Sequence, residues 1–186
     1  QIGFFTSHFP ALVTDLCSPI GAGGVLAALG VSNTAQLGAW SIGLIGMANG
    51  VGTLIAGRLG SRYSKKYLLS SIYFGRVVIS VVFIMPPVSP GTVILFSVMM
   101  GMIRLASVPL TSALIGQIYG LRYMGTLYGI VFFSHQLGGF TGIWLGGALY
   151  DSTGGYELVW WIGVAVGAFS ALVHLPIQEE PRAAAA

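Results

Sequence analysis

Charge is scarce in this chain. Only 7% of its 186 residues are Asp, Glu, Lys or Arg, whereas a soluble domain carries about 25%. Hydrophobic residues make up 55% of the sequence, and the mean hydropathy is +0.85. This composition excludes an ordinary soluble domain and indicates an integral membrane protein that lies in a lipid bilayer.

Cysteine and the motifs of enzyme chemistry are also scarce. Cys17 is the single cysteine, which excludes an internal disulfide. No Cys/His group has metal-ligand spacing, and no nucleophile elbow, phosphate-binding loop or hydrolytic carboxylate pair is present. We therefore predict no catalytic residue, no metal and no cofactor, and we do not expect an enzyme.

What the chain has instead is long apolar runs. A helical span needs about 20 largely apolar residues, and breaks in the pattern divide the sequence into six such runs. We place them at about 2–31, 35–57, 67–85, 91–119, 123–150 and 158–177. The predicted fold class is an all-α membrane protein in which residues 1–186 form a single six-helix transmembrane bundle.

The basic residues fall on alternate connections between these runs. One connection holds four of them, and two others follow at the next alternate connection and the tail: Arg58, Arg62, Lys65, Lys66, Arg122 and Arg182. Because Lys and Arg gather on the cytoplasmic side, we expect an inner (plasma) membrane protein with both ends of this segment cytoplasmic. This distribution argues against a nucleic-acid partner.

The first run is interrupted, whereas the glycines of two others are regular. Pro10, Pro19 and the glycines of 21–24 predict a kinked or discontinuous helix. Glycines recur four residues apart within the fifth run and in the second run, where a further glycine lies one turn earlier, and this predicts close helix packing. A sliding face during a conformational cycle is the alternative reading. The glycines concerned are Gly43, Gly46, Gly50, Gly125, Gly129, Gly138, Gly142 and Gly146.

The connection "GRLGSRYSKK" carries a family resemblance. It resembles the signature G-x-x-x-D-R-x-G-R-[RK] of the major facilitator superfamily, with Gly57, Arg62, Lys65 and Lys66 in matching positions and serines where the signature has Asp and Gly. The resemblance implies a conformational-switch loop at these four residues. The stretches "SVPLTSALIGQIYG" and "LYDSTGGYELVWW" resemble the bacterial monocarboxylate and oxalate/formate branch.

This resemblance implies the second half of a twelve-helix transporter. Two six-helix bundles would rock about a central substrate site to give alternating access. The chain begins with Gln1 and runs straight into an apolar segment, so we expect that an N-terminal six-helix half is missing and would be its partner.

Polar side chains within the spans are the candidate site residues. Arg76 lies nine residues past Tyr67, roughly 14 Å into a core about 30 Å thick. Arg104 and His135 fall at roughly 18–20 Å by the same rise. Asp15 and Asn49 also fall near the middle of their runs, so we predict one polar layer at mid-membrane.

We predict that this layer binds substrate and moves protons. Arg104 is the first candidate for binding an anion, with Ser107 and Thr111 on its helical face; the alternative is that it pairs with a carboxylate such as Asp15. Pro109 should loosen that helix and free a carbonyl. Arg76 is the second candidate, either in the cavity or paired with Asp15, and Asn49 is a further substrate contact or a polar clasp. Asp15 and His135 are candidate proton carriers, although a membrane histidine also serves as a hydrogen bonder between helices.

Three functions compete at this point. The leading one is a secondary active transporter of a small organic anion, a mono- or dicarboxylate, driven by symport or antiport of protons or by anion exchange. The second is a proton-coupled exporter of lipophilic compounds, in which Asp15 and His135 would matter more than Arg104. The third is a non-transporting membrane scaffold.

Overall fold

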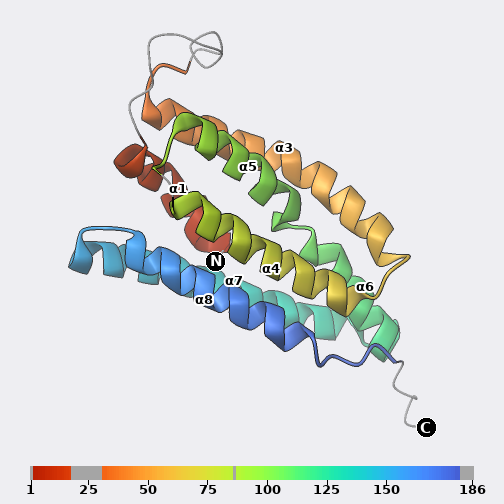
Figure 1. Ribbon diagram of the computed structural model, residues 1–186. Coiled ribbons are helices and arrows are strands. Elements are labelled where there is room, and N and C mark those ends of the chain that lie inside the picture. The colour runs from red at the N-terminus through yellow and green to blue at the C-terminus, as the bar shows by residue number, and fades with distance from the viewer. Residues whose placement is uncertain (1, 18–30, 86, 181–186) are drawn as a thin grey trace.

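The computed structural model describes residues 2–17, 31–85 and 87–180, and helices dominate this part of the chain. Their bounds are α1 (Ile2–Leu16), α3 (Thr34–Gly60), α4 (Lys65–Ile84), α5 (Pro90–Arg104), α6 (Ser107–Tyr119), α7 (Met124–Thr153) and α8 (Glu157–His174). The longer helices lie side by side along one direction, and α1 occupies only one end of the bundle (Figure 1). The most extensive contacts join α3 to α5 and α4 to α8.

Four helical segments among the described residues are long and apolar enough to cross a membrane. They are Thr34–Gly60, Lys65–Ile84, Pro90–Tyr119 and Glu157–His174, so the all-helical membrane prediction is confirmed. α1 has 15 residues, and a helix of that length rises only about 22 Å. α7 has 30 residues, with polar Ser134, His135 and Gln136 at its middle. The predicted count of six spans remains a prediction.

Local sequence explains where several helices begin and end. The Asn33 side chain accepts from the Gln36 N–H at 2.8 Å and caps α3. Ser89 and Thr92 form a capping box in front of α5, whose first residue is Pro90, a residue that suits this position because its missing N–H is not needed there. Gly154 follows the last residue of α7 as its C-cap and has a φ of 72°, a conformation that glycine adopts without strain.

Aromatic rings form the centre of the core at one end of the bundle. Phe9, Phe83 and Phe96 lie with ring centroids 4.4–5.9 Å apart, and Trp160 lies 5.4 Å from Phe83. The Trp160 Nε1–H donates to the Ser80 carbonyl at 3.0 Å. Trp160 lies close to a loop, where tryptophans commonly sit at the membrane interface, yet it is only 1% exposed. Trp144, in the middle of α7, is 62% exposed.

Glycines let α3 and α5 approach each other closely. A Cβ at Gly52 would collide with the Met102 backbone, and one at Gly101 would lie 2.7 Å from the Ile45 carbonyl oxygen. The glycines predicted to pack are mostly different ones. Built on Gly43, Gly46, Gly50, Gly125, Gly129 or Gly138, a Cβ has no described atom within 4 Å, so the packing prediction is wrong for these six within the described residues.

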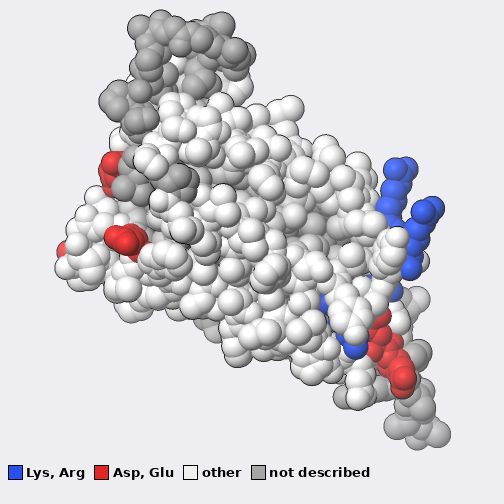
Figure 2. All heavy atoms as spheres, viewed as in Figure 1, with Lys and Arg blue, Asp and Glu red and all other residues white. Residues whose placement is uncertain are grey.

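Charged side chains gather at the ends of the molecule. Figure 2 shows Lys and Arg at one end of the visible face and acidic groups at both ends, with an almost uncharged surface between them. That distribution fits an apolar surface that lies in lipid.

Candidate substrate-binding cleft

The most unusual backbone feature is a break between α5 and α6, at Leu105 and Ala106. Pro109 has no N–H to donate to the Leu105 carbonyl, and the Val108 N–H donates to that carbonyl instead, at 3.0 Å. The carbonyls of Ile103 and Arg104 are thus available to side chains. The helix is thus loosened next to Pro109 as predicted, although the carbonyls that reach a side chain are those of Ile103 and Arg104 and not that of Leu105.

Arg76 of α4 reaches into this break. It is 3% exposed, and its Nη2 donates to the carbonyl oxygens of Ile103 at 2.9 Å and Arg104 at 2.6 Å. The same nitrogen lies 3.2 Å from the Ser107 hydroxyl oxygen. A buried guanidinium needs such acceptors, and here the broken helix provides them.

Asn49 of α3 meets the break from the opposite side. Its Oδ1 accepts from the Leu105 N–H at 3.0 Å, which in an unbroken helix would donate to the Gly101 carbonyl. Two side chains therefore hold the break: Arg76 donates to its carbonyls, and Asn49 accepts from its N–H.

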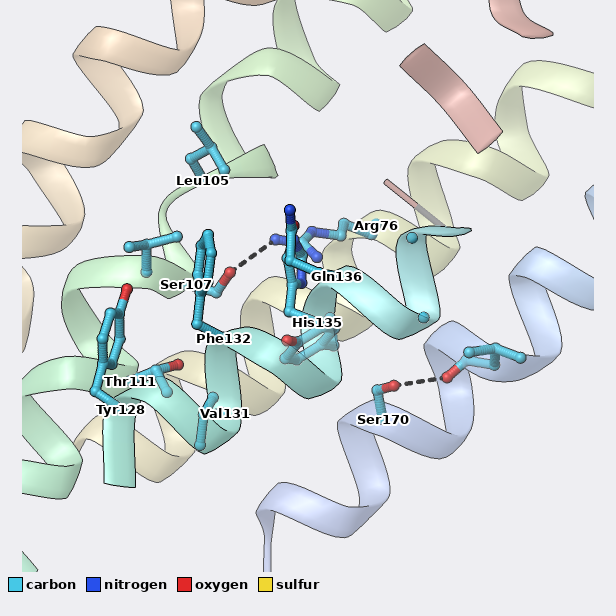
Figure 3. A pocket seen from close by; sticks show the side chains of 15 residues that line it. Arg76, Leu105, Ser107, Thr111, Tyr128, Val131, Phe132, His135, Gln136 and Ser170 are labelled. Carbon is cyan, nitrogen blue, oxygen red and sulfur yellow. Dashed lines mark hydrogen bonds between the residues drawn. The ribbon is translucent and has the colours of Figure 1, made fainter. Parts of the chain in front are cut away.

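A cleft of about 460 Å³ opens beside Arg76, between α4, α6, α7 and α8. Figure 3 shows the side chains around it, with Arg76 directed toward Ser107. No described residue that lines the cleft carries a carboxylate. The lining consists of Tyr73, Arg76, Leu105, Ser107, Val108, Thr111, Tyr128, Val131, Phe132, His135, Gln136, Gly138, Gly139, Val166 and Ser170.

The lining combines one cation with neutral polar groups and aromatic rings. Ser107, Thr111 and Gln136 offer hydroxyl and amide groups, and His135 offers an imidazole. The Arg76 guanidinium also lies over the Tyr73 ring, 4.8 Å from its centroid. Such a site can receive a small anion with an apolar portion.

The structure brings together four of the predicted site residues. Arg76, Ser107, Thr111 and His135 line the cleft. Arg104, the first candidate for anion binding, is half-buried at the end of α5 and is not among the lining residues. Asn49 does not line the cleft either and acts on the break behind it.

The structure places Asp15 elsewhere. Asp15 is exposed and lines a second cleft with Val88, Tyr150, Tyr156 and Glu157, next to the turn between α7 and α8. The predicted mid-membrane position for Asp15 assumed a helix over 2–31, whereas α1 ends at Leu16. The predicted polar layer and the alternative pairing with Arg76 are therefore wrong for Asp15, and residues 18–30 of that run lie outside the described residues.

Sequence reasoning missed several lining residues. Gln136 follows His135 directly, and Tyr73 precedes Arg76 by three residues, which puts it on the same helical face. Their closeness in sequence to a predicted site residue could therefore have indicated both. Tyr128 of α7 and Ser170 of α8 had no such indication, because their position depends on how separate helices meet.

The predicted switch loop is joined to the tail that follows α8. The Glu179 carboxylate accepts from the Ser64 hydroxyl at 2.9 Å and from the Lys66 N–H in the first turn of α4. Lys65 Nζ donates to Gln117 Oε1 at 2.7 Å, and Gln117 Nε2 donates to the Glu179 carbonyl at 2.9 Å.

The other two loop residues differ in their surroundings. Arg62 lines a shallow hollow with Arg58, and Gly57 faces open space.

The sequence profile of the Major Facilitator Superfamily matches residues 3–186, almost the whole chain. The chain belongs to the major facilitator superfamily. With its four membrane-length helices, this makes it a multi-pass membrane protein.

A comparison with individual proteins finds a relative in the same superfamily. The chain is similar to an uncharacterized MFS-type transporter, YcxA of Bacillus subtilis (strain 168), with 29% identity over 143 residues, which cover 72% of this chain. The same alignment spans only about a third of that relative, 34% of its length. No solved structure matches the chain significantly.

Proposed function

We propose that this chain is half of a secondary active transporter of the major facilitator superfamily, and that a small organic anion binds in the cleft beside Arg76. The observation that carries the proposal is a buried guanidinium in a cleft of about 460 Å³ whose described lining holds no carboxylate. An arginine at the centre of a span costs about 2.5–3.5 kcal/mol on insertion scales. A function that needs the charge would justify that cost.

The rest of the lining supports a carboxylate as the anion. Thr111 and Gln136 can hydrogen-bond its oxygens, while Phe132 and Val131 provide surface for a short carbon chain. His135 lines the cleft, and an imidazole there can carry a proton, which fits proton symport, whereas exchange with a second anion would balance charge without it. Of the two candidate proton carriers, His135 lines this cleft, whereas Asp15 lines another, so we propose His135 as the proton carrier.

A second six-helix half and a membrane location belong to the same proposal. Alternating access needs a second six-helix bundle, and exposed apolar side chains on α7, among them Phe133, Phe140 and Trp144, provide a surface for it. We propose the inner (plasma) membrane, with the basic connection at 57–66 cytoplasmic.

Uptake by the full-length protein in proteoliposomes tests this proposal. The substrates are radiolabelled C2–C4 mono- and dicarboxylates, with a lipophilic cation as the competing substrate class. We expect carboxylate uptake, and at least a tenfold loss of uptake in Arg76→Lys, because lysine keeps the charge but lacks the planar fork that pairs with a carboxylate.

The matched control is Arg104→Lys, which changes the other membrane arginine in the same way and should keep most of the uptake. Monodisperse elution of each variant shows that it is folded. If carboxylate uptake survives Arg76→Lys but not Arg104→Lys, Arg104 and not Arg76 binds the anion. Uptake of the lipophilic cation alone would favour an exporter of lipophilic compounds.

A further inference from the structure

Arg76 uses a single nitrogen to hold the helix break. Its hydrogen bonds to Ile103, Arg104 and Ser107 all start from Nη2, which carries only two hydrogens for three acceptors. The Nε of Arg76 is buried and has no hydrogen-bond partner among the described residues. The donor capacity of Nη2 is therefore fully used, whereas that of Nε is not.

A carboxylate that binds an arginine through two parallel hydrogen bonds needs Nη2. Such a ligand approaches either the side of the guanidinium, where Nε and Nη2 point the same way, or its end, where Nη1 and Nη2 do. Both arrangements include the nitrogen that now donates to the carbonyls of Ile103 and Arg104. Two-point anion binding and support of the break thus compete for the same hydrogens.

We propose that anion binding at Arg76 breaks the hydrogen bonds by which Arg76 stabilises the break between α5 and α6. Asn49 is then a positioning residue that sets how strongly anion binding and the geometry of the break are coupled. The inference rests on the anion-binding function proposed above. It adds the consequence of binding: a change of helix geometry 27 and 28 residues along the chain from Arg76.

The released carbonyls have other donors close by. In a continuous helix the Ile103 and Arg104 carbonyls accept from the N–H groups of Ser107 and Val108. The Leu105 N–H would then turn from Asn49 to the Gly101 carbonyl. Leu105 alone would lack a donor to its carbonyl, because of Pro109. α5 and α6 can therefore straighten once the anion has taken Arg76.

Asn49 favours the broken form, because its Oδ1 accepts the Leu105 N–H only there. Coupling between two sites is reciprocal, so a variant that weakens the broken form should strengthen anion binding. We expect Asn49→Ala to bind the carboxylate about fivefold more tightly, the effect of one net hydrogen bond. A residue with a purely structural role would not tighten binding when truncated.

The matched control is Thr53→Ala, one turn further along α3. Its hydroxyl donates only within the helix, to the Asn49 carbonyl at 2.8 Å. We expect this variant to bind the carboxylate like the wild type.

The experiment combines binding and distance measurements on the full-length protein in lipid nanodiscs. Spin labels at Leu95 of α5 and Ala113 of α6, both exposed in the structure, report the geometry across the break by double electron–electron resonance. The probes are acetate, lactate, oxalate and succinate, and affinity is measured by calorimetry. We expect the distance distribution to shift on addition of the tightest binder, and part of the shift to occur in Asn49→Ala without ligand.

Two results would overturn the inference, and they differ in what else they remove. Carboxylate binding with an unchanged distance distribution in the wild type removes the coupling and leaves the proposed anion site standing. No binding of any of the four carboxylates removes the proposed function and the coupling together. The wild-type measurement decides the matter even when Asn49→Ala does not fold.

Discussion

α3 and α7 are both rich in glycine, and the glycines with similar spacing face open space on both helices, but α3 has a further glycine that packs against a neighbouring backbone. On α3, Gly52 lies against the Met102 backbone of α5, so closely that no side chain fits. On α7, Gly125, Gly129 and Gly138 face open space, and Gly146 is the buried residue of that helix. α3 is thus held in a close backbone contact with α5, which we call the seam, whereas α7 leaves most of its surface exposed.

This difference teaches that small residues serve two purposes in one membrane bundle. In the seam between α3 and α5 they allow backbones to touch, which gains packing energy within this chain. On α7 they leave a smooth apolar face beside the candidate cleft, whose wall includes Gly138 and Gly139. That face is where the proposed second six-helix half would pack.

The largest effect on folding is expected from placing a side chain in the seam between α3 and α5. Gly52→Leu should prevent α3 and α5 from pairing, because the added side chain meets backbone that cannot move aside. The measurement is the yield of monodisperse protein in detergent. Gly50→Leu is the control on the same helix, where a Cβ meets nothing within 4 Å. Equal loss in both variants would contradict the distinction between a seam and an open face.

Two tryptophans give the next test. Trp160 is 1% exposed and hydrogen-bonded to Ser80, whereas Trp144 of α7 is 62% exposed. We expect Trp160→Ala to lower the free energy of unfolding by about 3–5 kcal/mol, and Trp144→Ala to change it by about 0.5 kcal/mol or less. Equilibrium unfolding in mixed micelles measures both. In residues 1–186 expressed alone, without the proposed second half, a large loss in Trp144→Ala would show that α7 is packed more tightly than the structure has it.

A smaller effect is expected at the helix ends. α4 begins beside the Glu179 carboxylate, whereas α7 begins without a side-chain cap. Glu179→Gln should lower the free energy of unfolding by about 1–2 kcal/mol, since a carboxylate at a helix N-terminus both accepts from N–H groups and faces the positive end of the helix. Glu180→Gln, an exposed neighbour, is the control. Equal effects of the two changes would mean that Glu179 acts only as a surface charge.

The smallest effect on stability is expected on α7. Gly125→Ala and Gly129→Ala should raise the helix stability slightly, by up to about 1 kcal/mol each, because alanine is the better helix former. Carboxylate uptake by the full-length protein should nevertheless fall if the second half packs closely on this face. Unchanged uptake in the double variant would assign the face to lipid instead.

The helices and the break were largely predictable from the sequence. Long apolar runs end at polar connections because the bilayer sets their length, and Pro109 marks the break because it lacks an N–H. Pro19 and the glycines of 21–24 predict an interruption of the first run, but the sequence does not show that α1 ends at Leu16. Asp15 was misplaced because its depth was counted over the whole run.

The composition of the cleft was predictable only in part. In lipid both the outer and the inner face of a helix are apolar, so the sequence of α7 does not show which side faces its neighbours. Arg76 and Arg104 look alike in the sequence, as lone arginines in apolar runs. Only the packing of α4 against the break distinguishes them, because it places the Ile103 and Arg104 carbonyls within reach of Arg76.

The break has an electrostatic consequence for Arg76. Where α5 ends, its aligned peptide dipoles leave roughly half a negative charge on the terminal carbonyls, and those of Ile103 and Arg104 are the ones that Arg76 contacts. A helix terminus thus acts as a fractional counterion, where another protein would use an aspartate. It offsets only about half of the guanidinium charge, and the positive potential that remains in the cleft is what an incoming anion would meet.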